Sequence, residues 1–326
     1  MLDTLPNATD VRSAALRIEG KAYKTPLLEV PLLNEHLGFR LLVKPETLQR
    51  TGSFKFRGAY NRISRIPEDQ QQGGVVAFSS GNHAQGVAAA AQIHDLPALI
   101  VMPSDTPEIK IANTRAYGAE IVFYDRFGED REAIAEKLVA EKKATLVRPF
   151  DDPMIIAGQG TVGLEMAQQA RALDTTLDAV LSPCGGGGLV GGSALALASE
   201  SPQTEVYAVE PEDFDDTARS MVAGERLSIE PGATSFCDAL LSPEPGRLTL
   251  QINSRLLSGG LTVSDKAVTQ AMQIAFRYLK LVVEPGGAVA LAALLSGQYD
   301  GRGKTVGIIL SGGNVDEEVF RKALET

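Results

Sequence analysis

The sequence has few cysteines, no basic tract and no long apolar run, and each absence excludes a class of protein. Its two cysteines, Cys184 and Cys237, are too few for a disulfide framework and show no metal-site spacing with histidine, so we expect both to be buried and free. The longest apolar stretch, residues 288–295, is far too short to cross a bilayer. Residues 1–6 lack the basic start and apolar run of a signal peptide, which predicts a cytoplasmic protein.

Charge and composition restrict the partners. The formal charge is -10, from 31 basic and 41 acidic side chains, which argues against general binding to nucleic acid or to an anionic membrane. Apolar residues make up 44% and charged residues 22% of the 326 residues, as in a soluble globular protein with a sizeable core. A local basic pocket for one small anion stays compatible with this balance.

From residue 75 onward, short β-type runs alternate with helical patterns. Such alternation predicts an α/β fold with mainly parallel sheets covered by helices on both faces. A helix over 266–278 is expected because Ala267, Ala271, Ile274 and Tyr278 recur at helical spacing. The expected strands lie at 75–78, 98–101, 121–124, 179–181, 205–209 and 305–310, and further helices at 83–91, 109–117 and 131–143.

No flexible linker divides the chain, which indicates a second domain inserted within the first. The glycine pair at 73–74 and the Asp-Asp-Pro corner at 151–153 are the expected crossing points. The prediction is a large domain of residues 1–73 and 153–326 and a small inserted domain of residues 74–152. A cleft between two such lobes is a natural ligand site.

Lys55 lies between two phenylalanines in the run 53–59 (SFKFRGA). Burial disfavours the ammonium form of a lysine and leaves a nucleophilic amine, the state that Schiff-base chemistry requires. Taken alone, this run is more typical of a solvated lysine than of a catalytic one. Its interpretation depends on three other segments.

A glycine cluster follows the expected strand at 179–181. Backbone N–H groups of such a cluster converge on an anion where the next helix begins, so Gly185 to Gly188 predict a phosphate site. Gly186, Gly188 and Gly191 also fit the dinucleotide fingerprint, with Glu210 about 20 residues further on. A nicotinamide-dependent oxidoreductase therefore stays an alternative, although that interpretation leaves Lys55 unexplained.

Two polar turns follow other expected strands. At 79–83 (SSGNH), backbone N–H groups are suited to a carboxylate and the Asn82 amide to a ring oxygen, while simple helix capping is the structural alternative. We assign His83 no role in proton transfer. At 311–314 (SGGN), the Ser311 hydroxyl suits a ring nitrogen, although an ordinary turn is equally compatible. An amine, a phosphate cradle and two polar strand ends together predict a pocket for pyridoxal phosphate.

These segments resemble the serine/threonine dehydratase and serine racemase family, pyridoxal-phosphate enzymes of fold type II with a tryptophan synthase β-like, two-lobed fold. The resemblance covers nearly the whole chain, and the joint presence of its motifs in this order is specific. The matching runs are 53–59, 80–83, 157–161 (AGQGT), 185–188, 284–288 (EPGGA) and 311–314.

The resemblance implies a role for each site residue. Lys55 would carry the cofactor covalently, with Phe54 packed against the ring and Glu284 near it. The segment from Ser80 through Gly81 and Asn82 to His83 would take the substrate carboxylate. The remaining implied cofactor contacts are Asn82 at the ring hydroxyl, Gly185, Gly186, Gly187 and Gly188 at the phosphate, and Ser311 at the ring nitrogen.

An acidic loop, residues 210–216 (EPEDFDD), resembles the metal loop of serine racemases and related dehydratases. There Glu210, Asp216 and the carbonyl of Phe214 would be ligands, and such hard oxygen donors suit Mg²⁺, Ca²⁺ or Mn²⁺. A solvated acidic loop is the alternative.

The implied reaction is dehydration of a β-hydroxy amino acid, led by L-threonine and L-serine, to a 2-oxo acid and ammonia. Ser80 stands where serine racemases have serine, which makes minor racemase activity an alternative. Residues 234–239 (TSFCDA) depart from the family pattern and Phe150 differs from serine racemases, so 3-hydroxyaspartate stays open as substrate. About a dozen residues follow Asn314, which predicts no regulatory domain and a catabolic role; a homodimer is also implied. A non-catalytic cofactor-binding protein is a further alternative.

Overall fold

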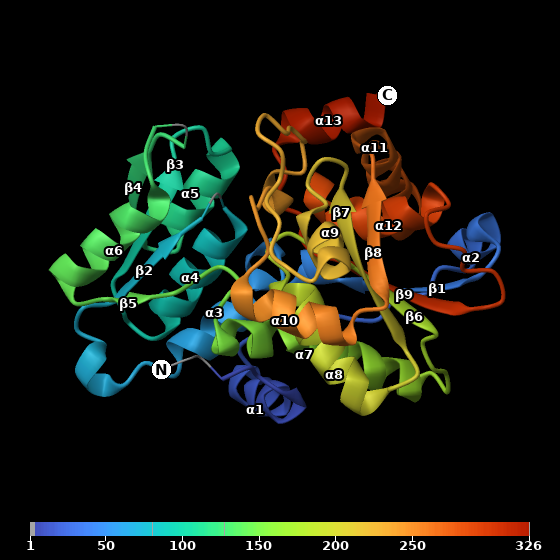
Figure 1. Cartoon of the computed structure of the whole chain (residues 1–326), viewed down its shortest axis with the longest axis horizontal. Helices are drawn as coiled ribbons and strands as arrows, with labels where there is room; N and C mark the ends of the chain where they lie inside the picture. The colour runs from blue at the N-terminus through green and yellow to red at the C-terminus, as the bar shows by residue number, and fades with distance from the viewer. Residues whose placement is uncertain (1–3, 80, 127, 326) are drawn as a thin grey trace.

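The computed structural model describes residues 4–79, 81–126 and 128–325, and these build two separate sheets flanked by helices (Figure 1). Every pair of neighbouring strands within the two sheets runs parallel. Parallel neighbours require crossover connections, and helices supply most of them. The α/β class with mainly parallel sheets is therefore confirmed.

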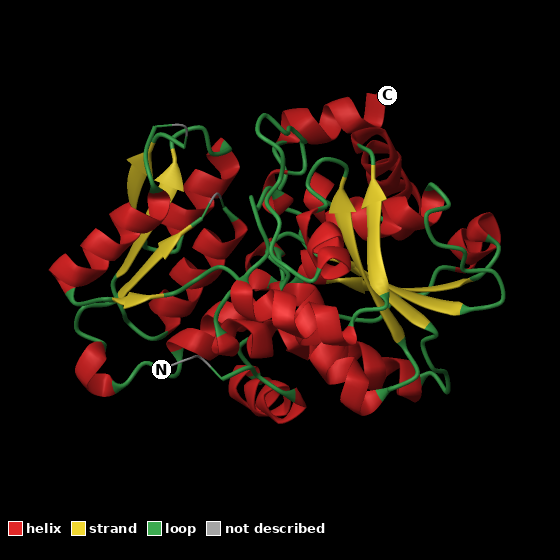
Figure 2. Cartoon of the chain, in the orientation of Figure 1, coloured by secondary structure: helices red, strands yellow, loops and turns green. Residues whose placement is uncertain are grey.

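The larger sheet has five strands in the order β1-β9-β6-β7-β8. Alternating side chains of its strands enter two different cores: Leu41 and Val43 pack with α12, whereas Leu42 packs with the side chains of α7 and α8. Figure 2 shows helices on both sides of this sheet. Its strands are β1 (Arg40–Pro45), β6 (Ala179–Pro183), β7 (Glu205–Pro211), β8 (Gly259–Val263) and β9 (Thr305–Leu310).

The smaller sheet has four strands in the order β4-β3-β2-β5. Its core also divides by face: Val75 and Ala77 pack with the alanine-rich side of α4, while Val76 and Phe78 pack with α6. Its strands are β2 (Val75–Phe78), β3 (Ala98–Pro103), β4 (Glu120–Tyr124) and β5 (Thr145–Leu146).

The helices that matter most for the site are three that begin at its edge and one that lies beneath it. Helices α3, α4 and α8 each start beside the pocket described below, and the 20-residue helix α7 packs against both α3 and α8. The α-helices are α1 (Ala8–Ile18), α2 (Pro31–Leu37), α3 (Lys55–Ile63), α4 (Asn82–Ile93), α5 (Glu108–Ala116), α6 (Arg131–Lys142), α7 (Pro153–Ala172), α8 (Gly188–Glu200), α9 (Asp216–Ala223), α10 (Arg247–Leu256), α11 (Asp265–Ile274), α12 (Pro285–Leu295) and α13 (Glu317–Glu325).

The expected elements lie where the sequence placed them, with two differences. The helix expected over 266–278 is α-helical only to Ile274 and continues as a π-helical turn, Ala275–Leu279. Strands β1, β5 and β8 were not expected. Both cysteines are buried and free, as predicted. No helix among the described residues is long and apolar enough to cross a membrane.

Candidate active site

A cleft lies where the loops at the carboxyl ends of the strands of the two sheets meet. It encloses about 990 Å³ including the open solvent at its mouth, room enough for a cofactor together with a small substrate. Its lining combines segments far apart in the sequence: Lys55 at the start of α3, the end of β2, the loop after β6 and the residue after β9. The structure therefore brings together the four segments that the sequence singled out.

Lys55 is the first residue of α3, and its half-buried side chain lines this cleft. Its Nζ donates a hydrogen bond to the carbonyl of Pro149 at 2.8 Å and lies 5.2 Å from the centre of the Phe54 ring. Burial lowers the pKa of Lys55 from 10.5 to about 8, although the charge of Glu284 opposes the shift. Near neutral pH an appreciable fraction of this amine is therefore uncharged and nucleophilic.

Backbone pairing ties Lys55 to the turn after β9. The N–H of Phe54 donates to the carbonyl of Ser311 at 3.1 Å, and Ser53 forms an isolated antiparallel bridge with Gly312. Ser311 is buried and lines the cleft beside Phe54 and Lys55. A serine at this place offers a neutral hydroxyl to a ring nitrogen.

The glycine loop ends β6 and opens α8. Gly187 is the N-cap of α8 with φ +87°, a conformation that L residues rarely adopt, and the N–H groups of the first turn of α8 have no partners within the helix. A methyl group on Gly186 would come within 2.4 Å of the Phe150 ring, and one on Gly187 within 2.6 Å of the Asn253 amide. Close packing thus explains much of the glycine run, and it leaves bare N–H groups and a positive helix end facing the cleft.

Asn82 begins α4, and both the nitrogen and the oxygen of its side-chain amide form hydrogen bonds. Its Nδ2 donates to Glu284 Oε1 at 2.5 Å, and its Oδ1 accepts from Asn314 Nδ2 at 2.9 Å. Glu284 is 1% exposed, and burial raises the pKa of its carboxyl although Lys110 opposes the shift. Glu284 therefore acts on the site through Asn82, which lines the cleft and whose amide group carries a second N–H donor.

The predicted carboxylate turn is described only in part, because Ser80 lies outside the described residues. Gly81 has φ +155°, and a methyl group there would meet the Lys110 side chain at 2.2 Å. His83 Nε2 lies 2.9 Å from the Val147 carbonyl, an acceptor that assigns the ring proton to Nε2. Burial and the charge of Lys55 lower the pKa of His83 to about 3, so its ring is neutral at any working pH.

Two cations in the cleft were missed from the sequence. Arg131, the first residue of α6, lies over the Phe78 ring with its guanidinium carbon 5.3 Å from the ring centre. Lys110, on α5, contacts Asp238 Oδ2 at 2.5 Å and Glu284 Oε2 at 3.3 Å. A cation in the first turn of a helix opposes the helix dipole. The position of Arg131 at the start of an expected helix could therefore have indicated a functional role from the sequence.

The acidic loop, residues 210–216, lies outside the cleft lining, and its three candidate ligands Glu210, Phe214 and Asp216 are buried. Glu210 accepts hydrogen bonds from the backbone N–H groups of Thr217 at 3.0 Å and Ala218 at 2.9 Å, and so caps α9. Asp216 is 1% exposed, and its Oδ2 has no hydrogen-bond partner among the described residues. Phe214 is buried beside them. No group of three or more His, Cys, Asp or Glu side chains in the described part of the chain is arranged to hold a metal ion.

Comparison with known proteins gives a family and several relatives. A family described as "Pyridoxal-phosphate dependent enzyme" matches residues 18–312. An L-threo-3-hydroxyaspartate ammonia-lyase from Pseudomonas sp is 45% identical over 97% of this chain and 98% of its own. A serine racemase from Schizosaccharomyces pombe is 40% identical over 97% of this chain and 96% of its own. The crystal structure of a threonine deaminase from T.th. is 45% identical, with a TM-score of 0.89 over 95% of this chain and 99% of its own.

The chain belongs to the family of pyridoxal-phosphate-dependent enzymes. The cleft fits this cofactor on chemical grounds. Lys55 offers an amine with a lowered pKa to an aldehyde, and the first turn of α8 offers free N–H groups to a phosphate.

Proposed function

We propose that the protein is an ammonia-lyase that dehydrates β-hydroxy amino acids to 2-oxo acids. The observation that carries this proposal is the placement of Lys55, with a pKa lowered to about 8, in one cleft with the glycine loop and Ser311. Relatives that cover nearly the whole chain are ammonia-lyases, a racemase and a deaminase of hydroxy amino acids by name. Their names support the reaction class and leave the substrate to be argued from the cleft.

Several residues of the cleft have a task in this proposed reaction. Bound pyridoxal phosphate supplies an electron sink that makes the Cα proton of an amino acid acidic. Lys55 would hold the cofactor covalently, and its Nζ, when not bonded to the cofactor, would take the Cα proton of the substrate. The first turn of α8 neutralises the phosphate, and Phe54 packs against the ring. Ser311 would offer the ring nitrogen a neutral hydroxyl, which does not hold that nitrogen protonated. The ring would then withdraw electrons less strongly, which favours prompt loss of the β-hydroxyl as water.

Asn82, Gly81 and His83 complete the substrate side of the site in this proposal. Backbone N–H groups at the start of α4 receive the α-carboxylate, and Asn82 keeps one amide proton for the ring hydroxyl. Ser80, at the same turn, stays a prediction both as a carboxylate ligand and as the acid on the opposite face of Cα, and racemase activity stays a minor prediction with it.

A β-hydroxy dicarboxylic acid such as 3-hydroxyaspartate fits the charges of the cleft better than threonine or serine. Lys110 already has Asp238 and Glu284 as anionic partners, and Lys55 is engaged by the reaction. Within the described part of the chain, Arg131 lies over the Phe78 ring and forms no ion pair, so its guanidinium can pair with a second carboxylate at the mouth of the cleft. We therefore propose 3-hydroxyaspartate as the preferred substrate, with L-threonine and L-serine as competitors.

A divalent cation at Glu210, Asp216 and the Phe214 carbonyl is proposed as a structural ligand. The buried Oδ2 of Asp216, unpartnered among the described residues and beside a second buried carboxylate, supports it, because such a pair repels itself unless a cation or protons intervene. Glu210 caps α9 without a metal ion, so any stability gained on metal binding would come from Asp216. The metal would stabilise the loop after β7, and Mg²⁺, Ca²⁺ and Mn²⁺ all suit these oxygen donors.

The division into a large lobe and a small lobe of residues 74–152, the homodimer and the cytoplasmic location stay predictions. The lobe division is supported by the smaller sheet, whose strands all fall within residues 75–146. A catabolic role also stays a prediction.

The function is tested by an assay for 2-oxo acid and ammonia over a panel of 3-hydroxyaspartate, threonine and serine. Lys55→Ala should abolish product formation with all three, because the cofactor loses its covalent partner and the Cα proton its base. Borohydride reduction followed by peptide mapping should place the cofactor on Lys55 in the native protein. Cofactor bound at Lys55 without ammonia from any substrate would instead indicate a non-catalytic binding protein. A bound nicotinamide would indicate an oxidoreductase.

A further inference from the structure

Helix α3 starts at Lys55 without a cap of its own. The N-cap residue, Phe54, has no side chain that can accept a hydrogen bond, and no such bond is present. The first turn of a buried helix still needs acceptors for its N–H groups. One comes from α7: Oε1 of Gln159 accepts from the Gly58 N–H at 3.2 Å. Gln159 is 1% exposed and lines the same cleft as Lys55.

The two helices touch through their backbones at this point. A methyl group on Gly158 would come within 2.6 Å of the Gly58 Cα, and one on Gly58 within 2.8 Å of the Ile155 carbonyl oxygen. Side chains at the crossing would push α3 away from α7 and move Lys55 with it. The 157–161 run, which the reaction does not otherwise use, is thus explained by contact with the helix that carries the reactive lysine.

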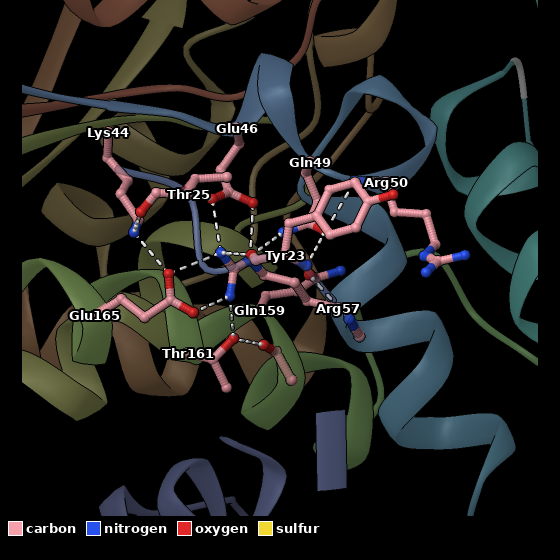
Figure 3. Close-up of polar contacts among 12 residues, drawn as sticks. Tyr23, Thr25, Lys44, Glu46, Gln49, Arg50, Arg57, Gln159, Thr161 and Glu165 are labelled. Atoms are coloured by element: carbon pink, nitrogen blue, oxygen red, sulfur yellow. Dashed lines mark hydrogen bonds and ion pairs between the residues drawn. The ribbon is translucent and has the colours of Figure 1, made fainter. Parts of the chain in front are cut away.

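Further along α7, a carboxylate holds the same helix. Arg57, which follows Lys55 and Phe56 in α3, is fully buried and donates to Glu165 Oε1 at 2.7 Å and Oε2 at 3.0 Å. Its remaining N–H groups go chiefly to Glu46, at 2.7 and 2.8 Å, and to Thr161 at 3.2 Å. Figure 3 shows this arrangement, with Arg57 held between carboxylates from two directions.

The second cation of this cluster fixes Glu165 in turn. Lys44, at 0% side-chain exposure, donates to Glu165 Oε2 at 2.6 Å and to the Thr25 carbonyl at 2.7 Å (Figure 3). It also donates to Gln169 Oε1 at 2.8 Å. All three of its N–H bonds are used. Buried ion pairs rarely add much net stability, because desolvation offsets their attraction. Their geometry is nevertheless well defined, which suits them to orienting a helix.

We propose that Gln159 and Glu165 of α7 are positioning residues for Lys55: they fix the first turn of α3, and so the place from which the amine reaches the cofactor. This proposal extends the function proposed above, and only its prediction for kcat rests on that function. Because α7 also packs against α8, through Gly160 on Gly192 and Gly163 on Ser193, one helix sets both the lysine and the phosphate end of the site.

The test uses the holoenzyme of Glu165→Gln, which keeps the shape of the side chain and removes its charge. We expect kcat to fall about tenfold with a much smaller change in KM, as for a misplaced catalytic group. The pH midpoint of the absorbance of the cofactor bound at Lys55 should shift as well, a change that loss of stability alone does not produce. Gln159→Leu should shift both readouts in the same direction, and it guards against a Glu165→Gln protein that fails to fold.

Glu200→Gln is the matched control. The Glu200 side chain is 17% exposed against 15% for Glu165, and it also pairs with two cations, Arg12 and Arg171, but far from the cleft. It should leave kcat and the absorbance midpoint unchanged. Wild-type values in both α7 variants, or an equal shift in Glu200→Gln, would show the proposal to be wrong. If the native protein released no ammonia from any substrate, the proposed function would fail while the absorbance comparison still decided the positioning role.

Discussion

Lys55 owes its reactivity to its surroundings, and only part of those surroundings is local in sequence. The flanking phenylalanines pointed to a desolvated amine, and in the structure desolvation lowers the pKa of the half-buried Lys55 to about 8. The acceptor for the amine, the Pro149 carbonyl, comes from 94 positions away along the chain. No pattern within the run 53–59 could have identified it.

The lowered pKa of Lys55 makes cofactor uptake depend on pH. The rate of covalent capture of pyridoxal phosphate should rise with pH and level off above about 8, because only the neutral amine attacks the aldehyde. Borohydride trapping at a series of pH values, with peptide mapping, measures this rate. Lys137, whose side chain is 76% exposed, is the control and should be labelled far more weakly at pH 8. A capture rate at Lys55 that is constant between pH 6 and about 9 would contradict the assignment.

Arg131→Met should change the choice of substrate. A hydrogen bond to a charged group contributes about 1.5–3 kcal/mol, so kcat/KM for 3-hydroxyaspartate should fall roughly 10- to 100-fold. The value for serine, which has no second carboxylate, should change much less. Arg115→Met is the control, because Arg115 also stacks on a ring, Phe123 at 5.8 Å, outside the cleft lining. Equal losses for both substrates would assign Arg131 a structural role only.

At the scale of single elements, the sequence was most informative where a strand runs into a loop and a helix. The glycine loop and the starts of α4 and α8 are local features, and their strands and helices were predicted from periodicity and glycine spacing. Strand β1 was not predicted; it contains Lys44, whose charged side chain is 0% exposed in the structure. A buried lysine is recognisable only once its partner on α7, Glu165, is known.

The glycine loop gives a prediction of its own. Gly186→Ala should weaken the binding of pyridoxal phosphate about tenfold or more, because the added methyl group meets the Phe150 ring at 2.4 Å and shifts the loop that faces the phosphate. Titration of the cofactor by its absorbance measures the effect. Gly259→Ala is the control, since its added methyl group meets nothing closer than 3.5 Å. Binding should recover in part when Phe150→Ala is added to Gly186→Ala; a loop that tolerates alanine without loss would refute the packing argument.

At the scale of the whole molecule, the cleft depends on contacts between segments of the two sheets. Lys110, which follows β3 of the smaller sheet, contacts Asp238 and Glu284, which both come after β7 of the larger sheet, and Asn82 contacts Glu284 as well. Each of these contacts joins segments that are distant in sequence. The α/β class could be predicted from strand and helix alternation, whereas the pairing of charges across the cleft could not, because charge alone does not reveal a partner.

Removal of divalent metal should lower the thermal stability of the whole protein. A cation at 100 times its Kd stabilises the folded state by about 2.7 kcal/mol, so chelator should lower Tm by several degrees and Mg²⁺ or Ca²⁺ should restore it. Asp216→Asn should remove the response to metal, while Asp300→Asn, at an exposed side chain, should keep it. If neither chelator nor metal changed Tm, the metal site would be refuted and Glu210 would serve only as a helix cap.

The hydrogen bond from Lys55 to Pro149 has a consequence for the rate of the step that restores the covalent bond of the lysine. In the proposed reaction the lysine is free of its covalent bond during part of each catalytic cycle. A defined hydrogen-bond acceptor keeps its amine in place, and without one the step that restores the bond would slow. The Pro149 carbonyl lies 2.8 Å from Nζ and belongs to the stretch that leads directly into α7. The segment that binds the free amine of Lys55 is therefore continuous with α7, the helix that we propose to position Lys55. A shift of α7 would then move both positions of the amine together.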